Sequence, residues 1–125
     1  MKKKVVTRNA PEATGPFSQA IVKDGFVFTS GQIYLTPEGK LLEGNTEEQT
    51  RQIMKNLQAV LESASVSFGD VVKTTIYVTN ISIYGKVNEV YGEYFSDSYP
   101  AREVIGVKEL PLGAKIEISM IAVKP

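Results

Sequence analysis

Apolar residues recur at three- and four-residue spacing in two segments of the chain, and this periodicity predicts two amphipathic helices. The first is expected to begin at Thr46-Glu47-Glu48-Gln49, which has the form of a capping box, and to end near Ser65. The second is expected to begin between Asn80 and Ser82. Stripes of this kind usually pack in a core, so we do not interpret them as ligand sites. Their members are Ile53, Met54, Leu57, Val60, Leu61 and Ala64, and then Ile83, Tyr84, Val87, Val90, Tyr91, Tyr94 and Phe95.

Six other segments have the alternation or composition of β-strands, near Val5-Val6 and at 19–22, 26–30, 71–79, 102–107 and 115–123. Lys23-Asp24-Gly25 predicts a hairpin turn, with glycine where a positive φ is needed. In the fourth strand Val72, Thr74, Ile76 and Val78 are expected to share one face. The order βββαβαββ predicts a single α+β domain over residues 1–125, with two helices on one face of a six-stranded mixed sheet.

The last predicted strand is apolar on both faces. Ile116, Ile118 and Met120 should face one side, while Ile121 and Val123 share the other side with Glu117 and Ser119. Two helices can cover only one face, and a large exposed apolar face is rare on a monomer. We therefore expect the second face to be buried against copies of the same chain, with binding sites in the clefts between them.

Composition removes several classes of chemistry. The 125 residues contain no His and no Cys, which excludes imidazole-based triads, Cys/His nucleophile pairs and the usual zinc sites. Fourteen basic and fourteen acidic residues give zero net charge, so no nucleic-acid partner is expected. Only Val5-Val6 follow Lys2-Lys3-Lys4, which is too short for the apolar region of a signal peptide, and no apolar segment is long enough to span a membrane. We therefore expect a cytoplasmic protein with no membrane partner.

The segment Tyr99-Pro100-Ala101-Arg102 offers a fixed cation. Pro100 holds Tyr99 in an extended conformation, which should end the preceding helix and direct Arg102 into a buried strand. A guanidinium binds a carboxylate through two parallel donors and stays protonated, so Arg102 is suited to hold a substrate, not to act as a base. The alternative is an edge-strand arginine in an ordinary salt bridge.

Several motifs, in the right order from about Asn9 to Val123, resemble those of the RidA/YjgF family of imine deaminases. They are Asn9-Ala10-Pro11, Gly15-Pro16-Phe17-Ser18-Gln19, Thr29-Ser30-Gly31-Gln32-Ile33, Val87-Asn88-Glu89-Val90-Tyr91, Pro100-Ala101-Arg102 and Lys115-Ile116-Glu117-Ile118. The resemblance implies a chorismate-mutase-like subunit fold and a homotrimer with its sheets packed at the centre and three clefts between subunits. This agrees with the separate argument for a buried second sheet face.

The resemblance also implies an activity, namely hydrolysis of 2-imino acids and enamines such as 2-aminoacrylate and 2-iminobutanoate to 2-keto acids and ammonia. It implies damage control of reactive metabolites and no cofactor or metal. Arg102 falls on the carboxylate-binding position, and Glu117 falls on the acidic position that would hold a catalytic water. Ser30, Gly31 and Asn88 fall on the remaining pocket positions.

Each implied site residue has a structural alternative. Gly31 could let a ligand approach its N–H, or serve only as a bulge or turn glycine. Ser30 could donate to a substrate oxygen or cap the strand end. Asn88 could bind a partner or remain half exposed on the helix. Glu117 could face solvent or lie buried at a subunit junction, where burial would raise its pKa.

The chain departs from the family pattern at three places. Phe17 stands where tyrosine is common, Glu103-Val104 where Ser-Cys is common, and Leu112-Gly113 where a charged pair is common. The departures leave the clamp and remove polar groups around it. One alternative is therefore a trimer that binds a keto or amino acid without turnover. Ribonuclease activity is disfavoured by the zero net charge and the lack of His.

Overall fold

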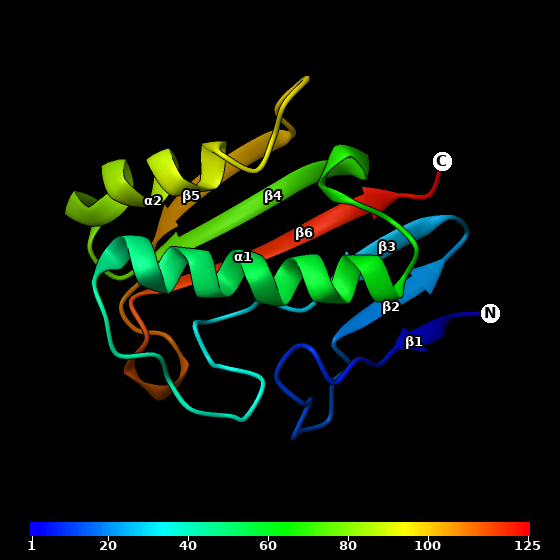
Figure 1. The fold of residues 1–125 in the computed structure, drawn as a ribbon, viewed down its shortest axis with the longest axis horizontal. Helices are drawn as coiled ribbons and strands as arrows, with labels where there is room; N and C mark the ends of the chain where they lie inside the picture. Colours follow the sequence, from blue (N-terminus) through cyan, green and yellow to red (C-terminus); the bar gives the residue numbers. More distant parts are fainter.

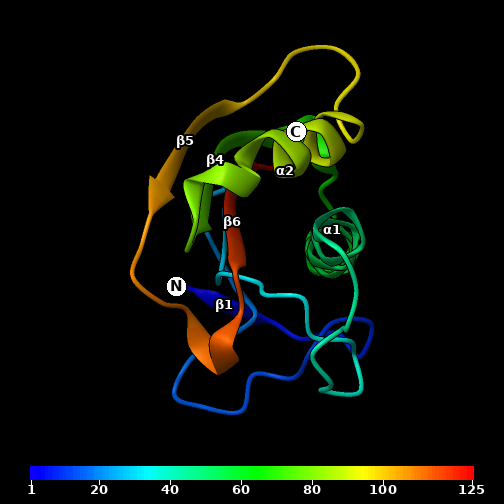
Figure 2. The same cartoon turned by 90° about the vertical axis from the view of Figure 1, so that its left-hand side faces the viewer.

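The computed structural model describes residues 1–125 as one twisted sheet with two helices on the same face (Figure 1). Viewed along the sheet, both helices lie on one side and the other face is uncovered (Figure 2). The predicted α+β fold with a six-stranded mixed sheet is therefore confirmed. The elements are β1 (Lys3–Val5), β2 (Ala20–Lys23), β3 (Phe26–Thr29), α1 (Thr46–Ser63), β4 (Val71–Val78), α2 (Tyr84–Gly92), β5 (Ala101–Gly106) and β6 (Ile116–Val123).

The strands are arranged in the order β1-β2-β3-β6-β4-β5, and only the β4–β5 pair is parallel. β5 is therefore an edge strand, and the expectation of a buried strand at Arg102 was wrong. β1 is the other edge and spans Lys3–Val5, so it ends at Val5, where the sequence was expected to begin the strand. The predicted β2–β3 hairpin is confirmed, with Asp24 and Gly25 both at positive φ.

Helix α1 begins one residue earlier than its predicted capping box implies. Asn45, not Thr46, is the N-cap: its Oδ1 accepts from Glu48 N at 2.8 Å, and Glu48 Oε1 accepts from Asn45 N at 2.9 Å. Gln49 instead donates from Nε2 to the Gly44 carbonyl. The short Asn side chain in extended backbone reaches its N3 amide, which places Thr46 inside the first turn.

Helix α2 is shorter than its apolar stripe. A 3₁₀ turn at Ile81–Ile83, capped by Asn80 Oδ1 on Ser82 N, leads into it, and it ends at Gly92. Tyr94 and Phe95 lie beyond the helix, where both rings pack edge-on against Phe68. The helix thus ends well before Pro100, which was expected to terminate it.

The core lies between the helices and the sheet, and Ile53, Met54 and Leu57 of α1 are fully buried there. In β6 the predicted alternation is confirmed, since Ile116, Ile118 and Met120 face the core. In β4 the expectation for Val72 was wrong. A register shift between Val71 and Lys73 turns Val71 inward and leaves Val72 47% exposed.

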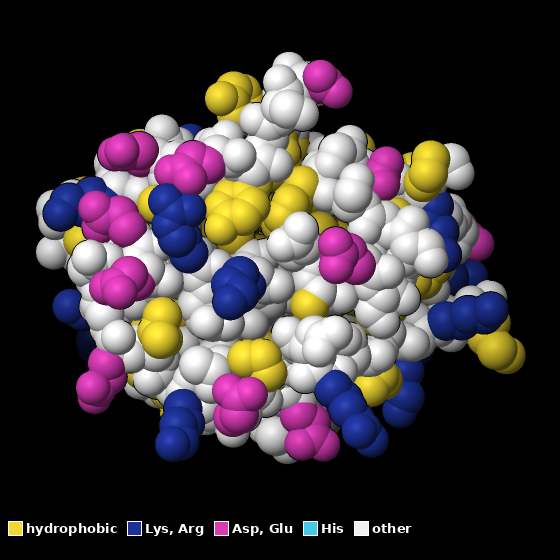
Figure 3. Space-filling view, in the orientation of Figure 1, with side chains coloured by type: hydrophobic (Ala, Val, Ile, Leu, Met, Phe, Trp, Pro, Cys, Tyr) yellow, Lys and Arg dark blue, Asp and Glu magenta, His cyan; other side chains and the backbone are white.

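The uncovered face of the sheet is the one on which Ile121 and Val123 were predicted to lie, together with Glu117 and Ser119. Phe26 and Phe28 on β3 stack at 6.0 Å and stand 43% exposed beside Ile121 and Val123 of β6. By contrast, the helix-covered side of the molecule carries interspersed acidic and basic side chains (Figure 3). Neither helix combines the length and apolar character needed to cross a membrane.

Candidate functional site

Arg102 lies on the helix-covered side of the sheet. Its backbone pairs with Thr74 of β4, and Thr74 is fully buried beneath α2, where its Oγ1 accepts from the Tyr91 hydroxyl at 3.0 Å. Residues directly opposite on neighbouring strands share a face, so the Arg102 side chain is directed toward α2. Pro100 directly precedes β5, so the chain enters this edge strand just before Arg102.

The guanidinium of Arg102 is held by groups that carry no negative charge. Nη1 donates to Asn88 Oδ1 and Nη2 to the Tyr84 hydroxyl, both at 2.5 Å. The rings of Tyr84 and Tyr91 lie 5.5 and 5.2 Å from Cζ, within the range of cation–π attraction. No carboxylate forms a salt bridge with it. We call Arg102, Asn88, Tyr84 and Tyr91 the arginine cluster.

The arginine cluster opens into a cleft of about 720 Å³. Its lining includes Asn88, Tyr91, Tyr99, Pro100 and Arg102, and two acidic residues, Glu89 and Glu93. Glu93 is already paired through both carboxylate oxygens with Arg51 of α1. A partly buried cation without a counter-ion, at the wall of a cleft, is the arrangement that a carboxylate ligand completes.

Glu117 lies on the uncovered face, because it alternates with the fully buried Ile116 and Ile118. Its side chain is half-buried and makes no salt bridge, and burial raises the pKa of its carboxyl group. The carboxylate rests against the backbone of Gly31: a Cβ built on Gly31 would come within hard contact of Glu117 Oε2. Gly31 does not have a positive φ, so space for Glu117, not backbone conformation, requires glycine here.

The backbone around Gly31 offers one free donor. The amides on either side are used, Ser30 N by the Gln19 carbonyl and Gln32 N by the Ile118 carbonyl, whereas the Gly31 N–H has no protein acceptor. The Ser30 hydroxyl is committed, since Oγ donates to the Ser18 carbonyl at 2.5 Å. This bond ties the loop before β2 to the end of β3, and the lone pairs of the Ser30 oxygen stay available as acceptors.

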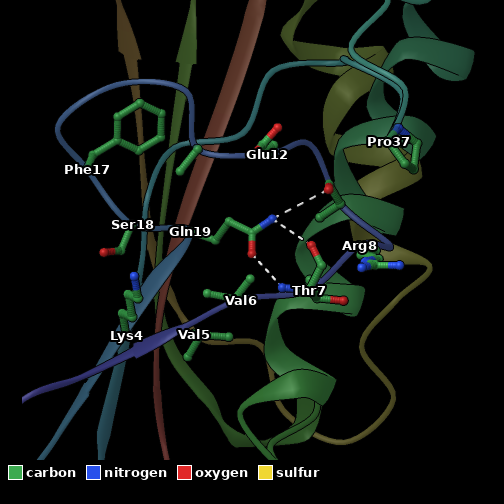
Figure 4. A pocket seen from close by; sticks show the side chains of 12 residues that line it. Lys4, Val5, Val6, Thr7, Arg8, Glu12, Phe17, Ser18, Gln19 and Pro37 are labelled. Carbon is green, nitrogen blue, oxygen red and sulfur yellow. Dashed lines mark hydrogen bonds between the residues drawn. The ribbon is translucent and has the colours of Figure 1, made fainter.

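Phe17 lies in that loop and is 56% exposed. Gln19 anchors the loop to the N-terminal segment: its Oε1 accepts from Thr7 N at 2.7 Å, and its Nε2 donates to the Thr7 carbonyl at 3.0 Å (Figure 4). Nε2 also donates to the Pro11 carbonyl at 2.8 Å. Phe17 also lines a pocket of about 520 Å³ whose other residues belong mainly to the N-terminal segment and this loop. We call Ser30, Gly31 and Glu117 the glutamate cluster; Phe17 lies outside it, in the loop that the Ser30 hydroxyl ties to the end of β3.

The structure thus brings the sequence-predicted residues together in two groups and not in one. Arg102 and Asn88 meet on the helix-covered side, while Gly31 and Glu117 meet on the uncovered face. The sheet separates the two groups, so Arg102 and Glu117 of the same chain cannot contact one small substrate. A site that uses both clusters requires a second copy.

Sequence reasoning missed Tyr84 and Tyr91 as site residues because both belong to the apolar stripe of α2. The available signal was their hydroxyl groups. A phenol four residues before Asn88 on the same helix can reach the group that Asn88 binds, because positions i and i+4 share a helix face.

Comparisons with known proteins cover nearly the whole chain. A family model described as Endoribonuclease L-PSP matches residues 7–124. A RutC family protein of Pyrococcus horikoshii is 45% identical over 125 residues, which span 99% of each chain. The mouse 2-iminobutanoate/2-iminopropanoate deaminase is 42% identical over 99% of this chain and 93% of its own length. The crystal structure of Escherichia coli TdcF with bound serine has a TM-score of 0.93 and 35% identity, over 98% of this chain and 99% of that chain.

Proposed function

We propose a function from the premise that this chain belongs to the RidA/YjgF family, to which its full-length matches assign it. The proposed activity is hydrolysis of short 2-imino acids and their enamine tautomers, such as 2-iminobutanoate and 2-aminoacrylate, to 2-keto acids and ammonia. The observation that supports this proposal most directly is that the Arg102 guanidinium lines a cleft and forms no salt bridge with a carboxylate of the chain. The mouse relative bears the name of this activity, and TdcF binds a small amino acid.

We further propose that each active site forms between two copies in a homotrimer. Two observations support an assembly. The uncovered face carries exposed Phe26 and Phe28, which a monomer would leave in water, and the arginine and glutamate clusters lie on opposite faces of one sheet. If the arginine cluster of one copy faces the glutamate cluster of the next, one substrate meets both.

In the proposed mechanism, Arg102 binds the substrate carboxylate through two donors, and the free Gly31 N–H donates to a substrate oxygen. A water molecule adds through its oxygen to C2 of the protonated imine, and Glu117 accepts a proton from that water. The resulting carbinolamine takes the proton back on nitrogen from Glu117. The C–N bond then breaks, its electron pair leaves with ammonia, and Glu117 accepts the hydroxyl proton as the C2 carbonyl forms. A carboxylate with a raised pKa suits both transfers, because its pKa lies nearer the working pH.

The proposal is tested by generating 2-iminobutanoate in situ with a dehydratase and measuring the appearance of 2-oxobutanoate. Wild-type protein is expected to accelerate imine loss, and Arg102→Ala is expected to abolish the acceleration. Lys55→Ala, which removes an exposed cation from α1, is the control and should retain activity. Acceleration that survives in Arg102→Ala would overturn the assigned clamp.

A second candidate function is binding of a small keto or amino acid without turnover, which the serine bound to TdcF favours. It predicts that this protein binds 2-oxobutanoate through Arg102 and yet leaves the rate of imine loss unchanged. The same two variants decide between the candidates once keto acid binding is measured beside the rate.

A further inference from the structure

The guanidinium of Arg102 is already partnered on one edge by two oxygens of the same helix. Nη1 donates to Asn88 Oδ1 and Nη2 to Tyr84 Oη. The Tyr84 hydroxyl in turn donates to Asn88 Oδ1 at 3.4 Å, so the two oxygens lie side by side. The three side chains form a closed ring of hydrogen bonds at the wall of the cleft.

The spacing of these oxygens identifies the edge that they occupy. A planar guanidinium has parallel N–H bonds on its end, between Nη1 and Nη2, and acceptors on any other pair of Nη hydrogens would stand more than about 5 Å apart. Oxygens 3.4 Å apart therefore sit on the end edge. Nε and the second hydrogen of Nη2 form the side edge, and Nε has no protein acceptor.

Helix α2 builds this arrangement from one face. Tyr84 and Asn88 are one turn apart, and Tyr91 follows three residues later with its ring 5.2 Å from Cζ. The Tyr91 hydroxyl is bound to Thr74, so this residue contributes its ring alone. Tyr84 contributes both its ring and its hydroxyl, which accepts from Nη2 of Arg102 and donates to Asn88 Oδ1.

We propose that Tyr84 is a positioning residue: with Asn88 it fixes the plane of the Arg102 guanidinium and reserves the Nε–Nη2 edge for the carboxylate of the ligand. This deepens the proposed function, on which it rests for the identity of the ligand as a carboxylate. Phenylalanine at position 84 would keep the ring and remove the acceptor. The guanidinium would then keep a single hydrogen bond, to Asn88, and could turn about its Nε–Cζ bond.

The variant that tests this is Tyr84→Phe, with Tyr94→Phe as the matched control. Tyr94→Phe also removes one phenol hydroxyl, but Tyr94 packs against Phe68 and lies outside the arginine cluster. Two measurements are made: the rate of Arg102 Nη rotation by nitrogen-15 NMR in the free protein, and the Kd of 2-oxobutanoate by calorimetry. Tyr84→Phe is expected to speed the rotation and to weaken binding about 3- to 10-fold. Tyr94→Phe should change neither.

Two results would overturn the proposal. Unchanged rotation and Kd would make Tyr84 a packing residue, and tighter binding in Tyr84→Phe would mean that its hydroxyl competes with the ligand for the same edge. The proposed function fails separately. Keto acid binding without imine turnover removes the enzyme and leaves the positioning role intact. If wild-type protein binds no keto acid, the carboxylate site fails, and the rotation measurement alone decides whether Tyr84 fixes the guanidinium.

Discussion

At the scale of single residues, the contact between Gly31 and Glu117 gives a direct test of the glutamate cluster. Gly31→Ala places a Cβ where the carboxylate now lies, and the flexible end of Glu117 must move away. We expect the free energy of unfolding to change by less than about 1 kcal/mol and turnover of 2-iminobutanoate to fall at least about tenfold. Gly106→Ala is the control, because its Cβ meets open space. Equal activity in both variants would contradict the role of Glu117.

The raised pKa of Glu117 predicts how activity depends on pH. As a base it must be ionised, so kcat/KM is expected to rise with pH through a midpoint above the ordinary glutamate value. Glu117→Gln should remove this limb. A profile that keeps the same limb in Glu117→Gln would assign the titration to another group.

The same pKa shift predicts that stability falls with rising pH over the range in which activity rises. Burial raises the folded-state pKa above the unfolded value, so the folded protein binds more protons in that window and loses stability as pH rises through it. Glu117→Gln is therefore expected to have a flatter stability profile there than the wild type. Urea unfolding at a series of pH values checks the sign.

Phe17 predicts a gain of function. Tyrosine is common at this position in the family, and the Phe17 ring is exposed in a loop that the Ser30 hydroxyl ties to the end of β3. We expect Phe17→Tyr to raise kcat/KM on small imino acids, because a phenol adds a donor at the edge of the proposed cleft. Steady-state kinetics on 2-iminobutanoate measure this, and an unchanged or lower value would exclude a role for the missing hydroxyl.

Sequence reasoning at this scale named Arg102, Asn88 and Glu117 and missed the two tyrosines that contact Arg102. Arg102 could be singled out because few other groups were able to carry chemistry, and Gly31 because strand-end glycines let a ligand approach. The commitment of the Ser30 hydroxyl to Ser18 could not be predicted, since it joins residues that only the fold makes neighbours. The same holds for Tyr84, whose periodicity is that of a core residue.

At the scale of elements, the cap of α1 is the point where prediction and structure differ by one residue. Asn45→Ala removes the side-chain oxygen that accepts from Glu48 N, and we expect it to cost about 1 kcal/mol. Thr46→Ala changes a residue inside the first turn and should cost less than about 0.5 kcal/mol. Chemical denaturation of the two variants measures the difference, and a larger loss in Thr46→Ala would support the cap predicted from sequence.

The exact ends and faces of the elements depend on local backbone conformation, which the spacing of apolar residues does not determine. Both Asn45 and Thr46 satisfy a capping pattern, and only the backbone conformation at Asn45 decides between them. The register shift in β4 exchanges Val71 and Val72 between the faces, although both are equally apolar. The two helices and the central strands β4 and β6 were predictable because each buries a regular stripe of residues.

At the scale of the whole molecule, the separation of the two clusters predicts complementation. Arg102→Ala and Glu117→Gln should each be inactive alone. If sites form between copies, co-refolded mixtures should regain activity, because some sites receive Arg102 from one variant and Glu117 from the other. Random mixing in a cyclic trimer would restore roughly a quarter of the sites. Assembly without any recovered activity, measured on the same samples, would contradict a shared site.

The uncovered apolar sheet face was predictable from sequence, whereas the division of the candidate residues between the two faces was not. Apolar residues on both faces of β6 indicated a second buried face before the fold was known. Which face receives Arg102 depends on the pairing of β5 with β4, in which Arg102 lies opposite Thr74. That pairing is a long-range property, and no local pattern in 102–107 determines it.

The close approach of Glu117 to Gly31 also limits how this protein can evolve. A side chain at position 31 fits only after the carboxylate has left its place, so its effect depends on what position 117 already carries. Substitution at 31 first is harmful, whereas substitution at 117 first makes a later change at 31 nearly neutral. We therefore expect the two positions to change in a preferred order, with position 117 before position 31, and a carboxylate to return to its present place only beside a glycine at position 31.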